Sequence, residues 1–254
     1  MPVPLGNHRH PARILLLGLF LLGLVSCSGL PGTNPKPGAS PDVPTTAADD
    51  TTGFSWWHAR FITPLAVNEE PRWVSDLMVA DLVIEPVIGE FASSLALWRF
   101  HRRAIPDAGG HIFSFIFYAD RQTAVQLFAT IDKSPALARL RQHGLIDRYE
   151  NDLLAENRRS DLSGASDGNW SLPLQEVWPA YIMGASVMWL GLINQHIDAT
   201  DAADRDFDEL VAAYENVNAA LGELWRKEGQ HAFLHHLNAL FGYEPMRLQV
   251  ETNF

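Results

Sequence analysis

The chain has 254 residues, a net charge of −11 and one cysteine. This acidic balance argues against nucleic acid or an anionic lipid surface as a partner, because basic patches recognise both. A single cysteine cannot form a disulfide within the chain, so stability must come from a hydrophobic core, which a chain of this length can bury.

The N-terminus carries Arg9 and then an uncharged, mostly apolar run over 14–25. A helix needs roughly 20 residues to cross a bilayer, so this shorter run after basic residues predicts a secretory signal peptide over 1–26. The run ends in Leu24-Val25-Ser26-Cys27, which resembles the lipobox of bacterial lipoproteins. The resemblance implies cleavage before Cys27 and lipidation of its thiol, with palmitate among the acyl groups.

In that family an aspartate after the cysteine favours retention in the inner membrane, and this chain has Ser28 there. The resemblance therefore implies an outer-membrane protein that faces the periplasm, with the membrane as a partner through its lipid anchor. The alternative is a buried structural cysteine after an ordinary cleaved signal peptide. Without 1–26 the chain holds 17 basic and 30 acidic side chains, a net charge of −13.

Residues 27–53 are rich in Pro, Gly, Ser, Thr and Asp and contain no aromatic side chain. Such a segment buries too little apolar surface to offset the entropy of ordering, so we expect a disordered tether. A single globular domain is expected over 54–254.

The first half of this domain alternates between strand and helix patterns. Aromatic and β-branched residues predict strands, and apolar residues three and four positions apart predict a helix that Pro86 interrupts. The predicted elements are a strand over 54–62, a helix over 73–93 and strands over 95–102 and 111–118. The last of these is apolar at successive positions, which is typical of a central strand that is covered on both sides.

Asp120 and Ser134 are residues that cap helices, and Gly144 is a typical stop, so two helices are predicted before a short strand over 145–149. The resulting order is β-α-β-β-α-β, which predicts an α+β fold with a ferredoxin-like split βαβ sheet followed by C-terminal helices.

Residues 57–149 also resemble the C-terminal elimination domain of lantibiotic dehydratases. The resemblance rests on Trp98, Phe100 and the strand that begins at His111. It implies the same order of elements, and no catalytic residue is transferred from it.

The C-terminal part reads as helices after a polar loop over 158–169. Residues 177–193 carry no charge, and we expect a buried core helix there rather than a membrane span. Asp206 begins a capping box for a helix that Gly229 is expected to end, and a last helix is predicted to stop at Gly242.

His231 and His235 lie four residues apart and would share one helical face, with Glu228 as a third ligand if the helix continues past Gly229. This spacing predicts a site for zinc or iron. Zincins place a glutamate directly after their first histidine, and this chain has Ala232 there. The alternative is a set of ordinary histidines near a helix end.

A second candidate site follows from strand alternation. His58 and Arg60 would share one face of the first strand, Arg99 and His101 one face of the second, and His111 would begin one face of the third. Five such side chains could form a cationic site for a carboxylate or phosphate group. The alternative is that they face water or pair with the many acids.

The sequence lacks a glycine-rich phosphate loop, and no cysteine nucleophile remains in the domain over 54–254. We therefore expect a binding or scaffolding protein of the cell envelope rather than an enzyme. Its expected partner is an envelope protein or a small anionic ligand, and nucleic acid is not expected. The alternative function is a metal-dependent hydrolase that uses His231, His235 and Glu228.

Overall fold

The computed structural model describes residues 53–63, 65, 70–104, 110–155, 159–197 and 205–245. All described residues belong to one compact unit, which spans 46–254. The predicted signal peptide, Cys27 and almost all of the predicted tether therefore lie outside the described residues.

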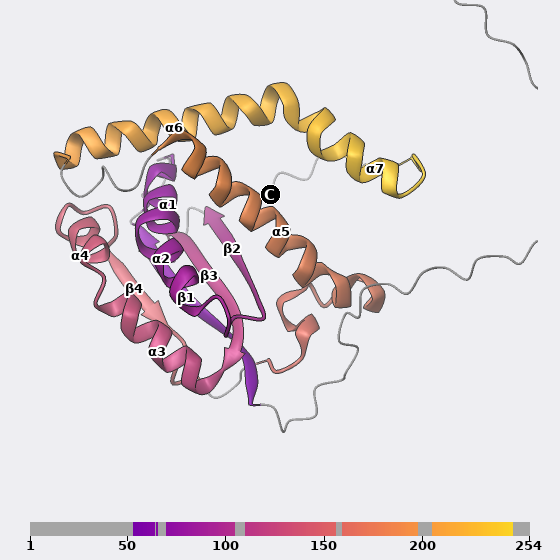
Figure 1. The fold of residues 1–254 in the computed structure, drawn as a ribbon, viewed down its shortest axis with the longest axis horizontal. Helices are drawn as coiled ribbons and strands as arrows, with labels where there is room; N and C mark the ends of the chain where they lie inside the picture. The colour runs from indigo at the N-terminus through magenta and orange to yellow at the C-terminus, as the bar shows by residue number, and fades with distance from the viewer. Residues whose placement is uncertain are drawn as a thin grey trace, which may run out of the picture. The chain divides into compact units, whose positions relative to one another are not determined.

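Four strands form one antiparallel sheet in the order β2-β3-β1-β4 (Figure 1). The strands are β1 (Phe54–Thr63), β2 (Leu97–Ala104), β3 (His111–Asp120) and β4 (Arg148–Asn151). The predicted strand that is apolar on both faces is β3, and it lies between β2 and β1. The α+β class and the split βαβ order are confirmed.

The first crossover is one helical run of α1 (Trp73–Val79), a π-helical segment (Ala80–Ile84) and α2 (Glu85–Phe91). Pro86 has no N–H group to donate, so a regular helix would lose a hydrogen bond there. The backbone widens just before it, and the Glu85 N–H donates to the carbonyl of Ala80, five residues back. The expected break at Pro86 is thus a π bulge within a continuous helix.

The second crossover consists of α3 (Arg121–Asp132) and α4 (Pro135–Gln142). The side chains of Asp120 and Ser134 accept hydrogen bonds from the backbone N–H groups of Thr123 and Leu137. Gly144 follows α4 with a φ of 69°, a conformation that favours glycine. Both predicted starts and the predicted stop are confirmed.

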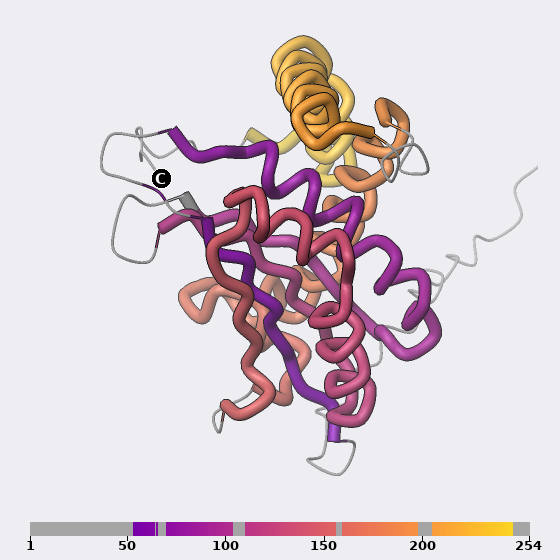
Figure 2. The backbone as a smooth tube through the Cα atoms, turned by 90° about the vertical axis from the view of Figure 1, so that its left-hand side faces the viewer, coloured from indigo at the N-terminus to yellow at the C-terminus, as the bar shows by residue number. Residues whose placement is uncertain are grey.

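Helices α1 to α4 cover one face of the sheet (Figure 2). The strand side chains on this face are the centre of the core: Trp57, Ala59, Phe61, Trp98, Phe100, Phe113, Phe115 and Phe117. On the opposite face Trp56, Ile116 and Tyr118 form a smaller cluster with Leu162. That residue begins a short 3₁₀ helix, η2 (Leu162–Ala165), which follows β4.

Helix α5 (Leu172–His196) lies along the free edge of β2 (Figure 1). The hydroxyl of Ser186 accepts a hydrogen bond from the backbone N–H of Phe100 at 3.1 Å, so the helix covers an edge that would otherwise attract another strand. Among the described residues, α5 is the helix long and apolar enough to cross a membrane.

The expectation that α5 is a buried core helix is wrong. Its buried residues are Pro179, Ser186, Leu190 and Ile193. An edge-covering helix contacts the domain along one narrow stripe, so most of its apolar surface stays exposed.

The C-terminal rod joins α6 (Phe207–Gly229), a π-helical segment (Gln230–His235) and α7 (His236–Leu240). The hydroxyl of Tyr214 donates to the buried carboxylate of Asp81, which ties α6 to the first crossover. The expected end at Gly229 is wrong, because Gln230 keeps helical φ and ψ angles. The predicted stop at Gly242 is confirmed by its φ of 69°.

Candidate functional site

The open face of the sheet holds four of the five predicted cationic residues. In the register, His58 lies opposite Ile116, and Ile116 lies opposite Arg99. Likewise, Ser114 on β3 lies opposite Arg60 of β1 on one side and opposite His101 of β2 on the other. Because side chains directly opposite in a sheet point to the same face, these residues form two parallel rows across the central strand.

A cleft of about 520 Å³ lies over these rows. His58, Arg60 and Arg99 line its floor, and the segment from Arg159 to Ser166 forms a wall. Asp152, just after β4, also lines it.

The wall is fastened to the sheet by a series of hydrogen bonds. The indole N–H of Trp56 donates to the carbonyls of Asp161 and Leu162 at 3.0 and 3.1 Å, and the Tyr118 hydroxyl donates to the carbonyl of Ser160 at 2.7 Å. Arg159 donates to the carbonyl of Gly164 at 2.9 Å. These contacts hold a third guanidinium at the cleft.

Arg99 is the most desolvated cation of the cleft. Its Nη2 donates to the carbonyl of Ala165 at 3.3 Å, and burial lowers its pKa. Its Nε is buried and has no hydrogen-bond partner among the described residues. A buried donor of this kind favours a site for an acceptor, because an unpaired polar group in a low-dielectric environment is costly.

His58 is held by Asp152 through two contacts. The carboxylate accepts from the backbone N–H of His58 at 2.9 Å and lies 2.8 Å from Nδ1 of its ring. Burial works to raise the pKa of Asp152, but the hydrogen bonds from His58 outweigh it and hold the pKa below its ordinary value. Asp152 therefore stays ionised and fixes the orientation of the imidazole.

His101 lies near the cationic side chains Arg99, His58 and Arg103. Burial, and then the charges of Arg99, His58 and Arg103, lower its pKa below the ordinary 6.5. The ring is therefore neutral at pH 7 and becomes protonated more readily when an anion enters.

Sequence reasoning missed Asp152 and Arg159. Both follow the last strand, Arg159 within the predicted polar loop over 158–169, and no spacing signal links either residue to His58 or Arg99. The packing of the wall on Trp56 and Tyr118 brings Arg159 to the cleft, and the pairing of β4 with β1 brings Asp152 there.

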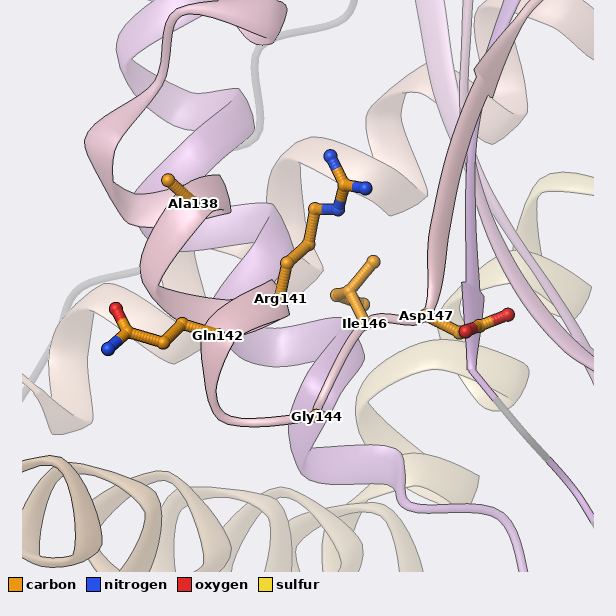
Figure 3. Close-up of a pocket in the computed structure, with 6 residues that line it drawn as sticks. All are labelled: Ala138, Arg141, Gln142, Gly144, Ile146 and Asp147. Carbon is orange, nitrogen blue, oxygen red and sulfur yellow. The ribbon is translucent and has the colours of Figure 1, made fainter.

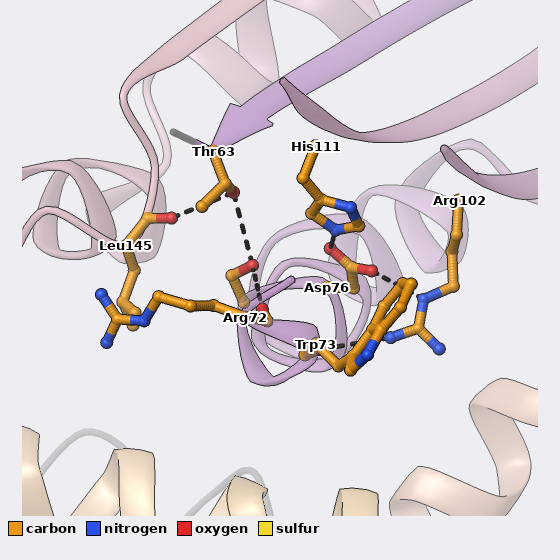
Figure 4. A network of polar contacts seen from close by, with 8 residues as sticks. Thr63, Arg72, Trp73, Asp76, Arg102, His111 and Leu145 are labelled. Atoms are coloured by element: carbon orange, nitrogen blue, oxygen red, sulfur yellow. Dashed lines mark hydrogen bonds and ion pairs between the residues drawn. The ribbon is translucent and has the colours of Figure 1, made fainter. Parts of the chain in front are cut away.

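His111 does not join this cleft. It lies opposite Thr63 and Ala104, on the face that the helices cover, and it is fully buried. Its Nε2 lies 2.7 Å from one oxygen of Asp76, and the Nε of Arg102 donates to the other at 2.6 Å (Figure 4). The expectation that all five cations share one face is wrong for His111.

The predicted metal ligands lie on the C-terminal rod. The rings of His231 and His235 stack with their centroids 5.1 Å apart, and His236 lies 5.3 Å from each. All three histidines and Glu228 are exposed. Within the described residues no group of three or more His, Cys, Asp or Glu side chains is arranged to hold a metal ion. The zinc or iron site stays a prediction.

A shallow depression of about 500 Å³ lies at the end of α4 (Figure 3). Its polar side chains, Arg141, Gln142 and Asp147, point in different directions. It therefore offers no convergent set of polar groups.

No protein-family model matches this chain, and no curated protein matches it. Among solved structures it is similar to the solution NMR structure of a de novo designed protein with a ferredoxin fold. The match has 14% sequence identity and a TM-score of 0.26, and it covers 47% of this chain and 92% of the designed one.

Proposed function

We propose that this chain is a lipid-anchored outer-membrane protein that binds a small oxyanion, a carboxylate or a phosphate group, in the cleft on the open sheet face. The observation that carries the proposal is the convergence of Arg60, Arg99 and Arg159 on one cleft, where the Nε of Arg99 is buried without a partner among the described residues. The signal peptide and lipobox support the location.

The guanidinium group suits this role because its planar set of N–H donors matches the oxygens of carboxylate and phosphate. The cleft is positive although the whole chain is acidic. The arginines therefore attract an anion at short range, inside a partly desolvated cleft. Hydrogen bonds to charged groups contribute about 1.5–3 kcal/mol each there. We infer binding rather than catalysis, with His58 as a further donor or acceptor to the ligand.

The test uses the compact unit 46–254 and isothermal titration calorimetry with sulfate and succinate, which stand for tetrahedral and planar oxyanions. Arg99→Gln should weaken binding by about 10- to 100-fold, the equivalent of one charge-assisted hydrogen bond. Arg141→Gln, the same change at an exposed position on α4, should leave the affinity unchanged. No binding by the parent protein, or equal binding by both variants, would contradict the proposal.

A pH series with sulfate tests the role of His101. Its pKa is below 6.5 without ligand, and a bound anion raises it, so binding takes up a proton. The affinity should therefore rise as the pH falls from about 7 toward the pKa of His101. His101→Gln should abolish this dependence, and an unchanged slope in the variant would exclude His101 from the site.

The anchor is tested on the full chain in a bacterium that processes lipoproteins. Metabolic labelling with an alkyne analogue of palmitate should mark the parent chain and should not mark Cys27→Ser. Fractionation should place the labelled protein in the outer membrane. Equal labelling of the two chains would exclude Cys27 as the lipidated residue.

A further inference from the structure

The groove between α5 and α6 is a second cavity, on the helical side of the sheet, with a volume of about 730 Å³. Segments from distant parts of the sequence line it. Its apolar wall includes Trp73, Met188, Trp189, Leu221, Trp225 and Phe233. Met188 and Trp225 are 40% and 58% exposed, so the groove opens to solvent along an apolar rim.

Arg102 enters this groove from β2 and is held in a fixed position. Its Nε donates to Asp76, and its Nη2 donates to the carbonyl of Trp73 at 3.3 Å (Figure 4). Its guanidinium carbon lies 4.5 Å from the centre of the Trp73 ring and 5.2 Å from that of Trp189. Cation–π contacts on two indoles and a buried carboxylate behind them preorganise the charge.

The side of Arg102 away from Asp76 remains accessible, since 29% of its side chain is exposed against 1% for Asp76. The carboxylate of Asp76 already accepts from Arg102 and lies against Nε2 of His111. An incoming anion therefore meets the outer N–H groups of the guanidinium and not the buried acid. The second arginine of the groove, Arg226, pairs with Glu223 at 2.9 Å on the surface of α6.

We propose that this groove binds a single-chain anionic amphiphile, a free long-chain carboxylate, with its head group on Arg102 and its alkyl chain between α5 and α6. Charge complementarity selects this occupant, because the outer N–H groups of one fixed guanidinium at the base of an apolar groove match one anionic head group and one tail. The volume lies within the range of about 300–1,000 Å³ that is typical of small-molecule sites. The site is separate from the oxyanion cleft, and neither proposal depends on the other.

The test measures fluorescence of cis-parinaric acid, a long-chain carboxylate, on the unit 46–254. Gly222→Phe fills the groove from α6, where an added Cβ meets only the end of the Arg226 side chain, at 3.4 Å. This variant should weaken binding by at least about tenfold. Gly184→Phe, on α5 and away from the groove, has open space around its Cβ and should leave the affinity unchanged. Equal loss in both variants, or loss in neither, would overturn the proposal.

The head-group contact is tested by displacement of the probe with myristate and with myristyl alcohol. The parent protein should prefer the acid by about tenfold, the equivalent of one charge-assisted contact. The double variant Asp76→Asn/Arg102→Gln removes both charges and leaves no buried ion unpaired, and it should bind the two ligands equally. Equal displacement by acid and alcohol on the parent would assign the groove to neutral apolar partners and overturn the carboxylate assignment. Circular dichroism checks the fold, and the comparison of acid with alcohol on the parent protein decides the question alone if the double variant does not fold.

Discussion

Replacement of Arg102 by glutamine tests whether Asp76 is a buried charge that depends on its partner. Asp76 is 1% exposed, and it loses a contact of 2.6 Å in this variant. Removing one partner of a buried ion pair costs about 3–5 kcal/mol, because the remaining charge stays desolvated. His111 still contacts Asp76 at 2.7 Å. We therefore expect a loss of stability at the lower end of this range, about 3 kcal/mol.

Asp76→Asn should cost less, about 1.5 kcal/mol, because Arg102 is partly exposed and its charge can turn to water. The double variant should lose less stability than the two single losses together, with a coupling on the order of 1–2 kcal/mol. Urea unfolding of the unit 46–254, followed by tryptophan fluorescence, measures the stability of the parent, of the two single variants and of the double variant. With an m-value of about 2 kcal/mol/M, Arg102→Gln should lower the midpoint by about 1.5 M.

A loss below about 1 kcal/mol for Arg102→Gln, with additive single effects, would refute this reasoning. It would mean that the side chain of Asp76 reaches water in the folded protein once Arg102 is replaced. Lys133→Gln, a change at an exposed position just after α3, is the matched control and should leave the midpoint unchanged within error.

Two further predictions follow from single contacts, and a third tests the metal site predicted from the sequence. Ser186→Ala leaves the backbone N–H of Phe100 without its acceptor and should cost about 1–3 kcal/mol in urea unfolding. Asp152 has a depressed pKa, so its stabilising effect is present above the ordinary value of 3.8 and is lost as the pH falls through its folded pKa. Asp152→Asn should therefore reduce the fall in the free energy of unfolding at acidic pH. It should also tighten sulfate binding in calorimetry, because it removes a negative charge from the lining of the cleft. If the predicted metal site exists, elemental mass spectrometry of untagged protein should find stoichiometric zinc or iron. The metal should be absent from the double variant His231→Ala/His235→Ala. A metal-free, folded parent would exclude the hydrolase alternative.

Local chemistry in the sequence determined where most elements begin and end, and in what order they follow. Asp120, Ser134 and Gly144 act within a few residues of themselves, through caps and a positive φ. Strand β3, which is apolar on both faces, could also be recognised as a central strand, because both of its faces must be covered. These features depend on neighbours along the chain, and a single sequence contains them.

The tertiary structure decided the environment of each functional side chain. A period of two shows which side chains share a face of a strand, but it does not show which face the helices will cover, and His111 lies with Asp76 for this reason. Likewise Gly229 could have ended a helix, and the rod continues through it.

The cleft and the groove needed long-range packing most of all. Arg159 reaches the cleft only because its segment packs on Trp56, more than a hundred residues earlier in the chain. Helix α5 is apolar enough for a core, yet it covers a sheet edge and leaves most of its surface exposed. Hydrophobic content measures what a segment can bury, whereas the number of partners around it determines what it does bury, and those partners come from the whole fold.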